Sequence, residues 1–447
     1  MPIKKISSSN GVVLPTDSFY GDLRDNNPLT PFIKGEKIER RYTTERFLFP
    51  EDWNVWVCEP EHLHEHPPLS EQEIVNALEH PTDSPPLHEL AKGKSSVAII
   101  VDDLSRPTPA YKVIPFVIEQ LKKGEVAEEN IFFIIGGGQH RPIVKWGEME
   151  KVMKLGDEIV ERFTVFDHDA LDDETYDIER PDGPTIRLDK NLRDAELVIG
   201  IGGIHPHGGA GFGGGAKIIV PGVSHQETIR YNHKFAWEGY GKIYPEQIEH
   251  DCIRKDAEIV AEYCLDFNVN IVMDPYKRIL HLATGNFITA HRKGCQVAKN
   301  AYLTKLMPET PDIVVANSYP FDTDLGQSGR GKSVFNHHDS SIHISIAACY
   351  DQIAYHGHPE GWKEFLRRQE LLETTQVYEF QATKENVEGK SSYLYSIHLN
   401  PKLYYQSKQP MILFDSWDKL IQEVNKVCPK THPTVALYPY SSLQLWL

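Results

Sequence analysis

The chain has 447 residues, of which 40% are hydrophobic and 25% are charged. That length predicts two or three domains, and the composition is that of an ordinary globular protein. The 64 acidic side chains outnumber the 47 basic ones, and the formal net charge of −17 excludes a general nucleic-acid or anionic-membrane binder, because both need basic surfaces.

No apolar run of about 18 residues occurs, so no membrane-spanning helix is expected. The first residues, MPIKKISSSN, carry two lysines but no apolar core, and we therefore expect no signal peptide. The six cysteines are scattered and form no CxxC pair. In a long chain this pattern indicates reduced thiols and a cytoplasmic location.

The first part of the chain alternates helices with short, wholly apolar strands. Helices are predicted at 71–80, 111–124 and 147–156. Buried strands are predicted at 95–103, 130–138 and 194–204. Continuous apolar strands that alternate with helices indicate a parallel α/β sheet covered on both faces.

The pattern starts again near residue 305. Strands are predicted at 310–320, 409–416 and 434–440, with a helix at 416–427 between the last two. We therefore expect two α/β domains with mainly parallel sheets, 1–305 and 306–447. The last residues of the chain could return to the first domain.

Three of the predicted strands end in polar or glycine-rich turns. These turns are DDLSRPTP (102–109), GGGQHRP (136–142) and IGGIHPHGG (201–209). In open α/β sheets, ligands bind outside the carboxyl ends of the strands. The three turns are therefore expected to converge on one site.

Two of these turns carry side chains that allow more than one interpretation. Arg106 could hold a carboxylate or phosphate through two parallel hydrogen bonds, or it could pair with Asp102 or Asp103 and close the loop. His140 follows three glycines. It could act as an acid or base near neutral pH, or it could be a surface histidine.

The third turn opens the stretch HPHGGAGFGGGAK, residues 205–217, which three chemistries could use. A zinc site could take its two histidines, with His225 or His233 as a third ligand. A phosphate loop of the Walker type is disfavoured, because Ile218 follows Lys217 where Ser or Thr is required. A nucleotide-like cofactor could lie on the glycines with Lys217 attached to it.

Taken in order, DDLSRPTP, GQHRP, HPHGGAGFGGGAKIIVPG and TIRYNH resemble the motifs of the nickel-dependent lactate racemase family. The similarity extends to PDIVVANSYPFDTDLGQSGRGK and covers roughly residues 95–335. It implies two α/β domains with the active site in the cleft between them. It also implies a racemase or epimerase of 2-hydroxy acids that uses a nickel-pincer nucleotide (pyridinium-3,5-bisthiocarboxylic acid mononucleotide).

The resemblance implies a role for each residue of the site. His140 and His207 would be the two acid/base groups, His233 the protein ligand to nickel, and Lys217 the covalent tether of the cofactor. Other cofactor contacts would come from Asp103, Gly211, Phe212, Gly214 and Pro221. The substrate would be bound by Arg106, Gln327 and Arg330.

These roles suit the chemistry. Transfer of a hydride from a 2-hydroxy acid to an electrophilic cofactor gives a planar 2-keto acid, to which the hydride can return on either face. A base on each side of the substrate must then take the hydroxyl proton. Histidine suits that task because its unperturbed pKa is about 6.5.

Three positions depart from the family pattern. Gly326 replaces a usual tyrosine, Arg330 replaces a usual lysine, and Gly213 replaces a usual serine. A lost tyrosine leaves space, so we expect a substrate larger than lactate, such as a sugar acid epimerised at C2. Alternatively, another aromatic side chain fills the gap, for which the candidates are Trp362, Tyr393 and Tyr395.

Other functions stay open from the sequence. The chain could be a lactate racemase proper, a zinc-dependent hydrolase that uses His205, His207 and His233, or a regulatory relative without activity. The expected partners are a small 2-hydroxy acid and, transiently, the enzymes of cofactor biosynthesis, with homo-oligomers as a further option. Neither nucleic acid nor a membrane is expected as a partner.

Overall fold

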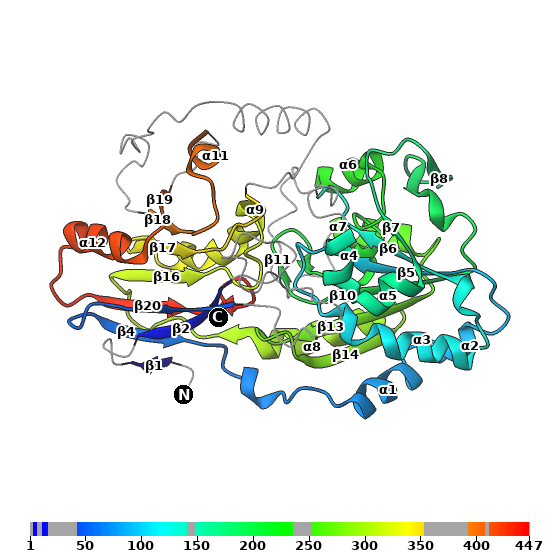
Figure 1. Cartoon of the computed structure of the whole chain (residues 1–447), viewed down its shortest axis with the longest axis horizontal. Helices are drawn as coiled ribbons and strands as arrows, with labels where there is room; N and C mark the ends of the chain where they lie inside the picture. Colours follow the sequence, from blue (N-terminus) through cyan, green and yellow to red (C-terminus); the bar gives the residue numbers. More distant parts are fainter. Residues whose placement is uncertain are drawn as a thin grey trace. The chain divides into compact units, whose positions relative to one another are not determined.

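The computed structural model describes residues 3–6, 11–16, 43–140, 148–235, 252–352, 392–406 and 411–446. Two compact units divide the chain (Figure 1). We call His64–Ala301 with His356–Pro359 the central unit. The terminal unit comprises Met1–Leu63, Tyr302–Tyr355 and Glu360–Leu447. Within the described ranges, no helix is both long and apolar enough to cross a membrane.

The central unit is built on one mainly parallel sheet. In spatial order its strands are β14 (Ile279–Gly285), β13 (Phe267–Met273), β10 (Leu197–Gly203), β5 (Val97–Asp102), β6 (Ile131–Gly136) and β7 (Thr164–Asp167). Neighbouring strands are parallel except β13 and β14. Every residue of β5 and β10 is buried, as expected for a sheet covered on both faces.

Helices connect these strands and cover the sheet. They are α1 (Glu71–Glu79), α2 (Leu87–Leu90), α3 (Ile114–Lys123), α4 (Glu148–Leu155), α5 (Asp157–Arg162), α6 (Gln226–Phe235), α7 (Cys252–Ala261) and α8 (Thr289–Tyr302). A short hairpin pairs β8 (Thr175–Ile178) with β9 (Ile186–Asp189). One core cluster joins Ala98 and Ile100 of β5 to Ala257 and Val260 of α7, so α7 covers one face of the sheet.

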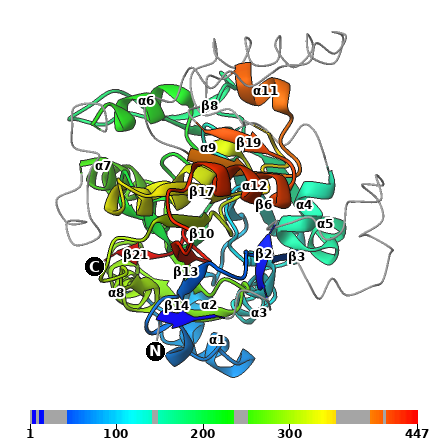
Figure 2. The ribbon, with the colours of Figure 1, turned by 90° about the vertical axis from the view of Figure 1, so that its left-hand side faces the viewer.

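The terminal unit has its own sheet, labelled in part in Figure 2. In spatial order the strands are β1 (Ile3–Lys5), β4 (Asn54–Cys58), β20 (Thr434–Tyr438), β16 (Ile313–Asn317), β17 (Ile342–Ile346), β18 (Ser392–Tyr395) and β19 (Ile412–Phe414). Only β1 is antiparallel to its neighbour. Shorter elements are β2 (Val12–Thr16), β3 (Thr43–Phe47), α9 (Leu325–Ser328), α11 (Pro401–Gln406) and β21 (Leu445–Trp446).

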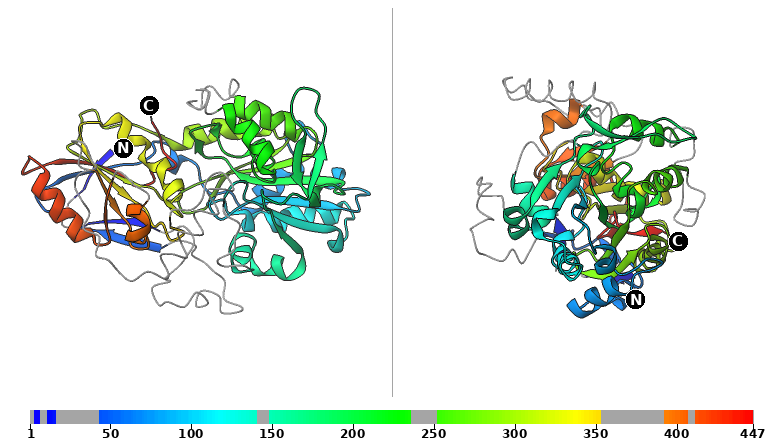
Figure 3. Two further views of the ribbon diagram at one scale, coloured as in Figure 1. Left: turned by 90° about the horizontal axis from the view of Figure 1, so that it is seen from above. Right: turned by 90° about the vertical axis from the view of Figure 1, so that its right-hand side faces the viewer.

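One face of this second sheet is covered by α12 (Trp417–Val427), which is red in Figure 3. Its apolar side lies in a core cluster with Phe47, Val315 and Leu437. Ser416 begins the helix, because its hydroxyl accepts a hydrogen bond from the Lys419 backbone N–H. The helix and strand patterns predicted around residues 409–440 therefore correspond to β19, α12 and β20.

The mixed α/β structure with mainly parallel sheets confirms the predicted fold class. Each strand predicted from apolar runs is present, and α3 ends at Gly124 as its sequence indicates. The sequence analysis did not predict the other strands of the two main sheets, which are β1, β4, β7, β13, β14, β17 and β18.

The division into units differs from the predicted domains at the N-terminal end. Residues 1–63 belong to the terminal unit because β4 pairs in parallel with β20, and because Trp53 and Val55 lie in that unit's core. The last residues stay in the same unit, where β21 pairs with β15 (Leu303–Thr304). Pairing between segments so distant in the chain leaves no local signal in the sequence.

Candidate functional site

The three polar or glycine-rich turns at 102–109, 136–142 and 201–209 follow strands that are neighbours in the central sheet, because β10, β5 and β6 are adjacent (Figure 1). The buried Asp102 side chain joins two of them. Its Oδ2 accepts a hydrogen bond from the Thr108 hydroxyl at 2.6 Å and another from the Gly203 N–H at 3.2 Å. The structure therefore brings together the turns that the sequence predicted to converge.

The turn after β5 holds His140 through a hydrogen-bond network. His140 Nδ1 donates to Asp103 Oδ2 at 2.8 Å, and the Ser105 hydroxyl donates to Asp103 Oδ1 at 2.7 Å. The Arg106 guanidinium donates to Ser105 Oγ at 2.7 Å, and its Nη2 lies 3.4 Å from His140 Nε2. Asp103 thus orients the imidazole, and His140 Nε2 faces Arg106.

Opposing effects act on the pKa of Asp103. Burial raises this pKa, but the charges of His140 and Arg106 and the hydrogen bonds from His140 and Ser105 outweigh burial, so that the net shift is well below the usual range. Asp103 is therefore ionised at neutral pH. A carboxylate in this position favours the tautomer in which His140 carries its proton on Nδ1.

Residues 205–217, which we call the glycine loop, begin as a tight hairpin. Strand β11 (Pro206–His207) pairs with β12 (Gly211–Phe212), and His207 Nδ1 accepts a hydrogen bond from the Gly209 N–H at 3.1 Å. The His207 side chain is half-buried, whereas His205 is buried. The two histidines of the HPH motif thus have different surroundings.

Close packing explains the glycine at position 213. A β-carbon added at Gly213 would lie 2.5 Å from Cε1 and 2.6 Å from Nε2 of the His205 ring. His205 therefore occupies the space that a side chain at 213 would need. The packing against His205 therefore accounts for the glycine that stands here in place of the family's usual serine.

A buried arginine binds the glycine loop from inside the protein. Arg254 of α7 is fully buried. Its guanidinium donates to the carbonyl oxygens of Gly214 at 2.8 Å, of Ala210 at 3.4 Å and of Phe212. His291 Nε2 donates to the Gly213 carbonyl at 2.8 Å. Sequence reasoning missed both residues, because an arginine and a histidine in helical patterns give no signal of their own.

Lys217 lies at the end of this loop on the 3-10 turn Gly215–Ile218, with its side chain half-buried. The Gly215 N–H donates to Asn270 Oδ1 at 2.8 Å, which fixes the turn on β13. Beyond Lys217 the chain meets the end of β6, where the Gly138 N–H donates to the Gly222 carbonyl at 2.9 Å. The backbone on either side of Lys217 is thus hydrogen-bonded to β13 and to the turn after β6.

His233 stands near the end of α6 and is half-buried. Burial, followed by the charges of Lys217 and His140, lowers its pKa to about 4. The ring is therefore neutral at pH 7, which is the form that ligates a metal. Lys217 and His140 thus both act electrostatically on His233.

Two of the predicted substrate-binding residues, Gln327 and Arg330, belong to the terminal unit. Gln327 is buried in α9, whose first turn is capped by Asp324 accepting the Gln327 N–H at 2.8 Å. Arg330 donates from Nε to Gln327 Oε1 at 3.2 Å and stacks over the Phe321 ring at 4.7 Å. Gly326 is exposed. Arg330 and Gln327 thus form one hydrogen-bonded pair.

The structure places two of the three aromatic side chains that were candidates for filling the space at Gly326. Tyr393 and Tyr395 lie in the hydrophobic core of the terminal unit, and the Tyr395 hydroxyl donates to Glu45 at 2.6 Å. Trp362 lies outside the described residues. Within the described part of the chain, no group of three His, Cys, Asp or Glu side chains could hold a metal ion by itself.

Comparison with known proteins gives a consistent family signal. Residues 41–241 match the lactate racemase N-terminal domain. The chain is 32% identical to a lactate racemase of Lactiplantibacillus plantarum over 272 residues, 60% of this chain and 63% of that protein. It is 29% identical to one of Thermoanaerobacterium thermosaccharolyticum over 314 residues, 68% of this chain and 72% of that protein. The match thus spans less than two thirds of the first relative.

Solved structures share the fold. The lactate racemase apoprotein of T. thermosaccharolyticum aligns with 98% of this chain and 100% of its own, with a TM-score of 0.67 at 22% identity. A protein from Thermotoga maritima aligns with 85% of this chain and 99% of its own, with a TM-score of 0.60 at 16% identity.

Proposed function

We propose that the chain belongs to the lactate racemase family and that it is an isomerase that racemises or epimerises a 2-hydroxy acid by reversible hydride transfer. The observation that carries the proposal is the cluster at the strand ends. His140, oriented by Asp103, lies beside Arg106, and the charges of Lys217 and His140 both lower the pKa of His233. These contacts support one site in the central unit with an acid/base group, an anion-binding group, an amine and a neutral imidazole.

The residues present fit a nickel-pincer nucleotide. The supporting observation is His233, whose lowered pKa leaves a neutral imidazole to bind nickel. We propose that Lys217 tethers the cofactor and that the bed beneath it is formed by Asp103, Gly211, Phe212, Gly214 and Pro221. When bound, the cofactor would supply the hydride acceptor.

The protein's own residues would bind the substrate and move its proton. The Arg106 guanidinium would hold the carboxylate of the 2-hydroxy acid through paired hydrogen bonds. His140 donates from Nδ1 to Asp103, which leaves Nε2 to accept the hydroxyl proton of one enantiomer. His207 would accept that proton from the other enantiomer. We propose Gln327 and Arg330, paired with each other, as further substrate contacts.

Gly326 supports a substrate larger than lactate. A glycine that is exposed at this position leaves the space that the family's usual tyrosine would fill. We therefore propose a sugar acid epimerised at C2, with lactate itself as the alternative. A zinc hydrolase would need three protein ligands, and no such group occurs within the described residues.

The test is to co-express the chain with the enzymes of cofactor biosynthesis, then measure bound nickel and intact mass. The expected result is a mass increase and stoichiometric nickel, with the mass increase lost in Lys217→Arg. Loaded protein is then assayed on a panel of 2-hydroxy acids by chiral chromatography. Unmodified mass without nickel would contradict the proposed cofactor, and lactate as best substrate would contradict the sugar acid.

Single changes of the two histidines test the acid/base roles. In loaded protein, His140→Gln and His207→Gln should each lower turnover by about a hundredfold or more while nickel binding stays unchanged. Turnover that survives both changes would contradict these roles. We further propose transient contact with the cofactor-biosynthesis enzymes, a cytoplasmic location and a homo-oligomeric form. The location agrees with the six cysteines, all of which are free thiols.

A further inference from the structure

A lysine on α4 binds the turn after β5 from inside the protein. Lys154 is only 1% exposed, and its ammonium donates to the Asp102 carboxylate. The same Nζ also contacts the carbonyl oxygens of Asp103 at 3.1 Å, Arg106 at 3.3 Å and Thr108 at 3.3 Å. One buried cation therefore binds the backbone on both sides of the Arg106 side chain.

Asp102 extends this contact to a second strand. While Lys154 binds its Oδ1, the other carboxylate oxygen accepts the Thr108 hydroxyl and the N–H of Gly203, the last residue of β10. The HPH motif that leads to His207 starts two residues after Gly203. The pair Lys154–Asp102 thus connects α4, the turn that carries Arg106 and the start of the glycine loop.

The chemistry of this pair favours a role in geometry over a role in stability. Removing two charges from water costs free energy that their attraction only partly offsets, so apolar residues of similar volume would serve a purely structural role as well or better. A buried ammonium, however, restricts its surroundings. Its hydrogen bonds are satisfied only when the accepting oxygens keep one arrangement. The oxygens in question belong to the turn that presents Arg106.

We propose that Lys154 is a positioning residue that acts through Asp102. It holds the turn that carries Arg106 and the β10 end that leads to His207 in one fixed arrangement. The expected effect on substrate binding rests on the function proposed above. The rigid arrangement of the two segments is independent of that function and can be measured on protein without cofactor.

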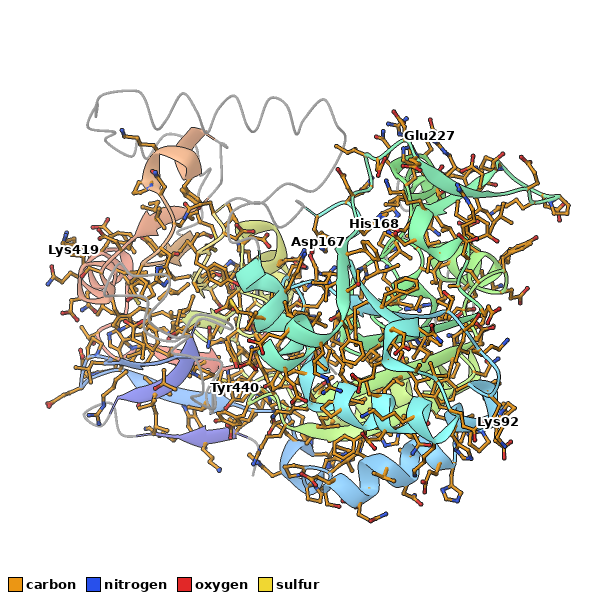
Figure 4. All side chains as sticks on the ribbon, turned by 45° about the vertical axis from the view of Figure 1, so that its right-hand side comes forward. Lys92, Asp167, His168, Glu227, Lys419 and Tyr440 are labelled. Atoms are coloured by element: carbon orange, nitrogen blue, oxygen red, sulfur yellow. The ribbon has the colours of Figure 1, made fainter. Side chains whose placement is uncertain are left out.

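Hydrogen exchange measured by mass spectrometry on the full chain tests the fixing. In Lys154→Met, peptides that contain 103–109 and 203–207 should both exchange about tenfold faster. The first loses a charged donor to its carbonyl oxygens, and in the second the Gly203 N–H is bound by Asp102, which loses its partner Lys154. The matched control is Lys151→Met on the same helix. Lys151 pairs with Asp167, labelled in Figure 4, at 3.3 Å, and this change should leave both peptides at the wild-type rate.

Kinetics of the loaded enzyme test the consequence, with activity normalised to bound nickel. Because Arg106 would hold the carboxylate equally in the ground and transition states, Lys154→Met should raise KM about tenfold with little change in kcat. A variant that is only less stable would have the wild-type KM, because its remaining folded, nickel-loaded molecules would bind substrate normally. If the loaded wild type has no racemase or epimerase activity, the proposed function fails, and hydrogen exchange still decides the positioning.

Asp102→Asn provides a second variant if Lys154→Met does not fold. It removes the charge that Lys154 binds while it keeps the side-chain size, and it should speed exchange in the same two peptides. The proposal is overturned if folded Lys154→Met or Asp102→Asn changes exchange only within 148–155 or in neither peptide. It is equally overturned if Lys151→Met produces the same acceleration.

Discussion

Gly213 and His205 show how a single close contact sets the shape of the glycine loop. The His205 ring lies where a side chain at 213 would be placed, and the Gly203 carbonyl is also within 2.9 Å of that position. The same loop contains Gly208, around which a β-carbon would meet no atom within 4 Å. Neighbouring glycines in one motif therefore serve different purposes.

This contrast predicts the outcome of two matched substitutions. Gly213→Ala should lower the free energy of unfolding by about 1–3 kcal/mol, because overpacking forces the His205 ring or the backbone to shift. Gly208→Ala should change that free energy by less than about 0.5 kcal/mol. Urea denaturation measures both. Equal effects at the two positions would show that close packing is not the reason for Gly213.

The buried state of His233 predicts a pH dependence of stability in protein without cofactor. Its pKa is about 4 in the folded chain and about 6.5 when unfolded. The unfolded state thus binds more protons between these values, and the contribution of neutral His233 is present above about pH 6.5 and lost as the pH falls toward 4.

Urea denaturation at several pH values tests this effect. Between about pH 7 and pH 5, His233→Gln should lose less unfolding free energy than the wild type, because the variant has no imidazole to protonate on unfolding. Exposed His432→Gln is the control and should follow the wild type. Parallel curves for His233→Gln and the wild type would contradict the burial argument.

At the scale of elements, buried side chains of three helices bind the backbone of the glycine loop and of the turn after β5. Arg254 of α7 and His291 of α8 bind carbonyl oxygens of the glycine loop, and Lys154 of α4 binds those of the turn after β5. Burial, together with the charge of Arg254, lowers the pKa of His291 well below its usual value. The loop is therefore held by one cation and one neutral ring.

The Arg254 contacts predict a large effect of its removal. Arg254→Met should lower the free energy of unfolding by about 2–4 kcal/mol, since several carbonyl oxygens lose a charged donor. Arg162→Met is the control, because the Arg162–Glu158 pair is exposed to solvent and should contribute about 0–1 kcal/mol. Denaturation of both variants measures the difference. An effect of Arg254→Met no larger than that of the control would show that the loop does not depend on this residue.

At the scale of the whole molecule, the terminal unit is assembled from both ends of the chain. Its sheet places β4 between β1 and β20, and Phe47, Trp53 and Val55 lie in its core. Asn317 adds a further link, because its side chain donates to the carbonyl oxygens of Pro15 and Pro439. The N-terminal segment is thus a structural part of this unit.

Deletion of residues 1–63 should therefore unfold the terminal unit. The expected result is rapid proteolysis within 302–352 and 392–446, whereas peptides of β5, β10 and β13 keep slow hydrogen exchange. Deletion of residues 1–10 is the control, since among the described residues it removes the edge strand β1 and Ile6 and leaves Phe47, Trp53 and Val55 in place, so it should cost far less stability. A terminal unit that stays protease-resistant without residues 1–63 would contradict this assembly.

The sequence predicted much of the fold and part of the site for local reasons. Apolar runs and glycine turns are continuous in the chain, so β5, β6 and β10 and the turns that follow them could be located directly. The sequence motifs also pointed to His140 and Arg106, which the structure brings within hydrogen-bonding distance of each other. Neither Lys154 nor Arg254 could be found in this way, because each resembles an ordinary helical residue until its partners are known.

The sequence by itself determined that the protein is a mainly parallel α/β structure whose strands end in polar or glycine-rich turns. Only the tertiary structure decided which groups meet at those turns. It also decided that the first 63 residues join the terminal unit and that Gly213 is required by His205. The physical reason is that periodicity and turn chemistry are short-range properties, whereas burial, hydrogen bonding and pKa depend on residues that are distant in the chain.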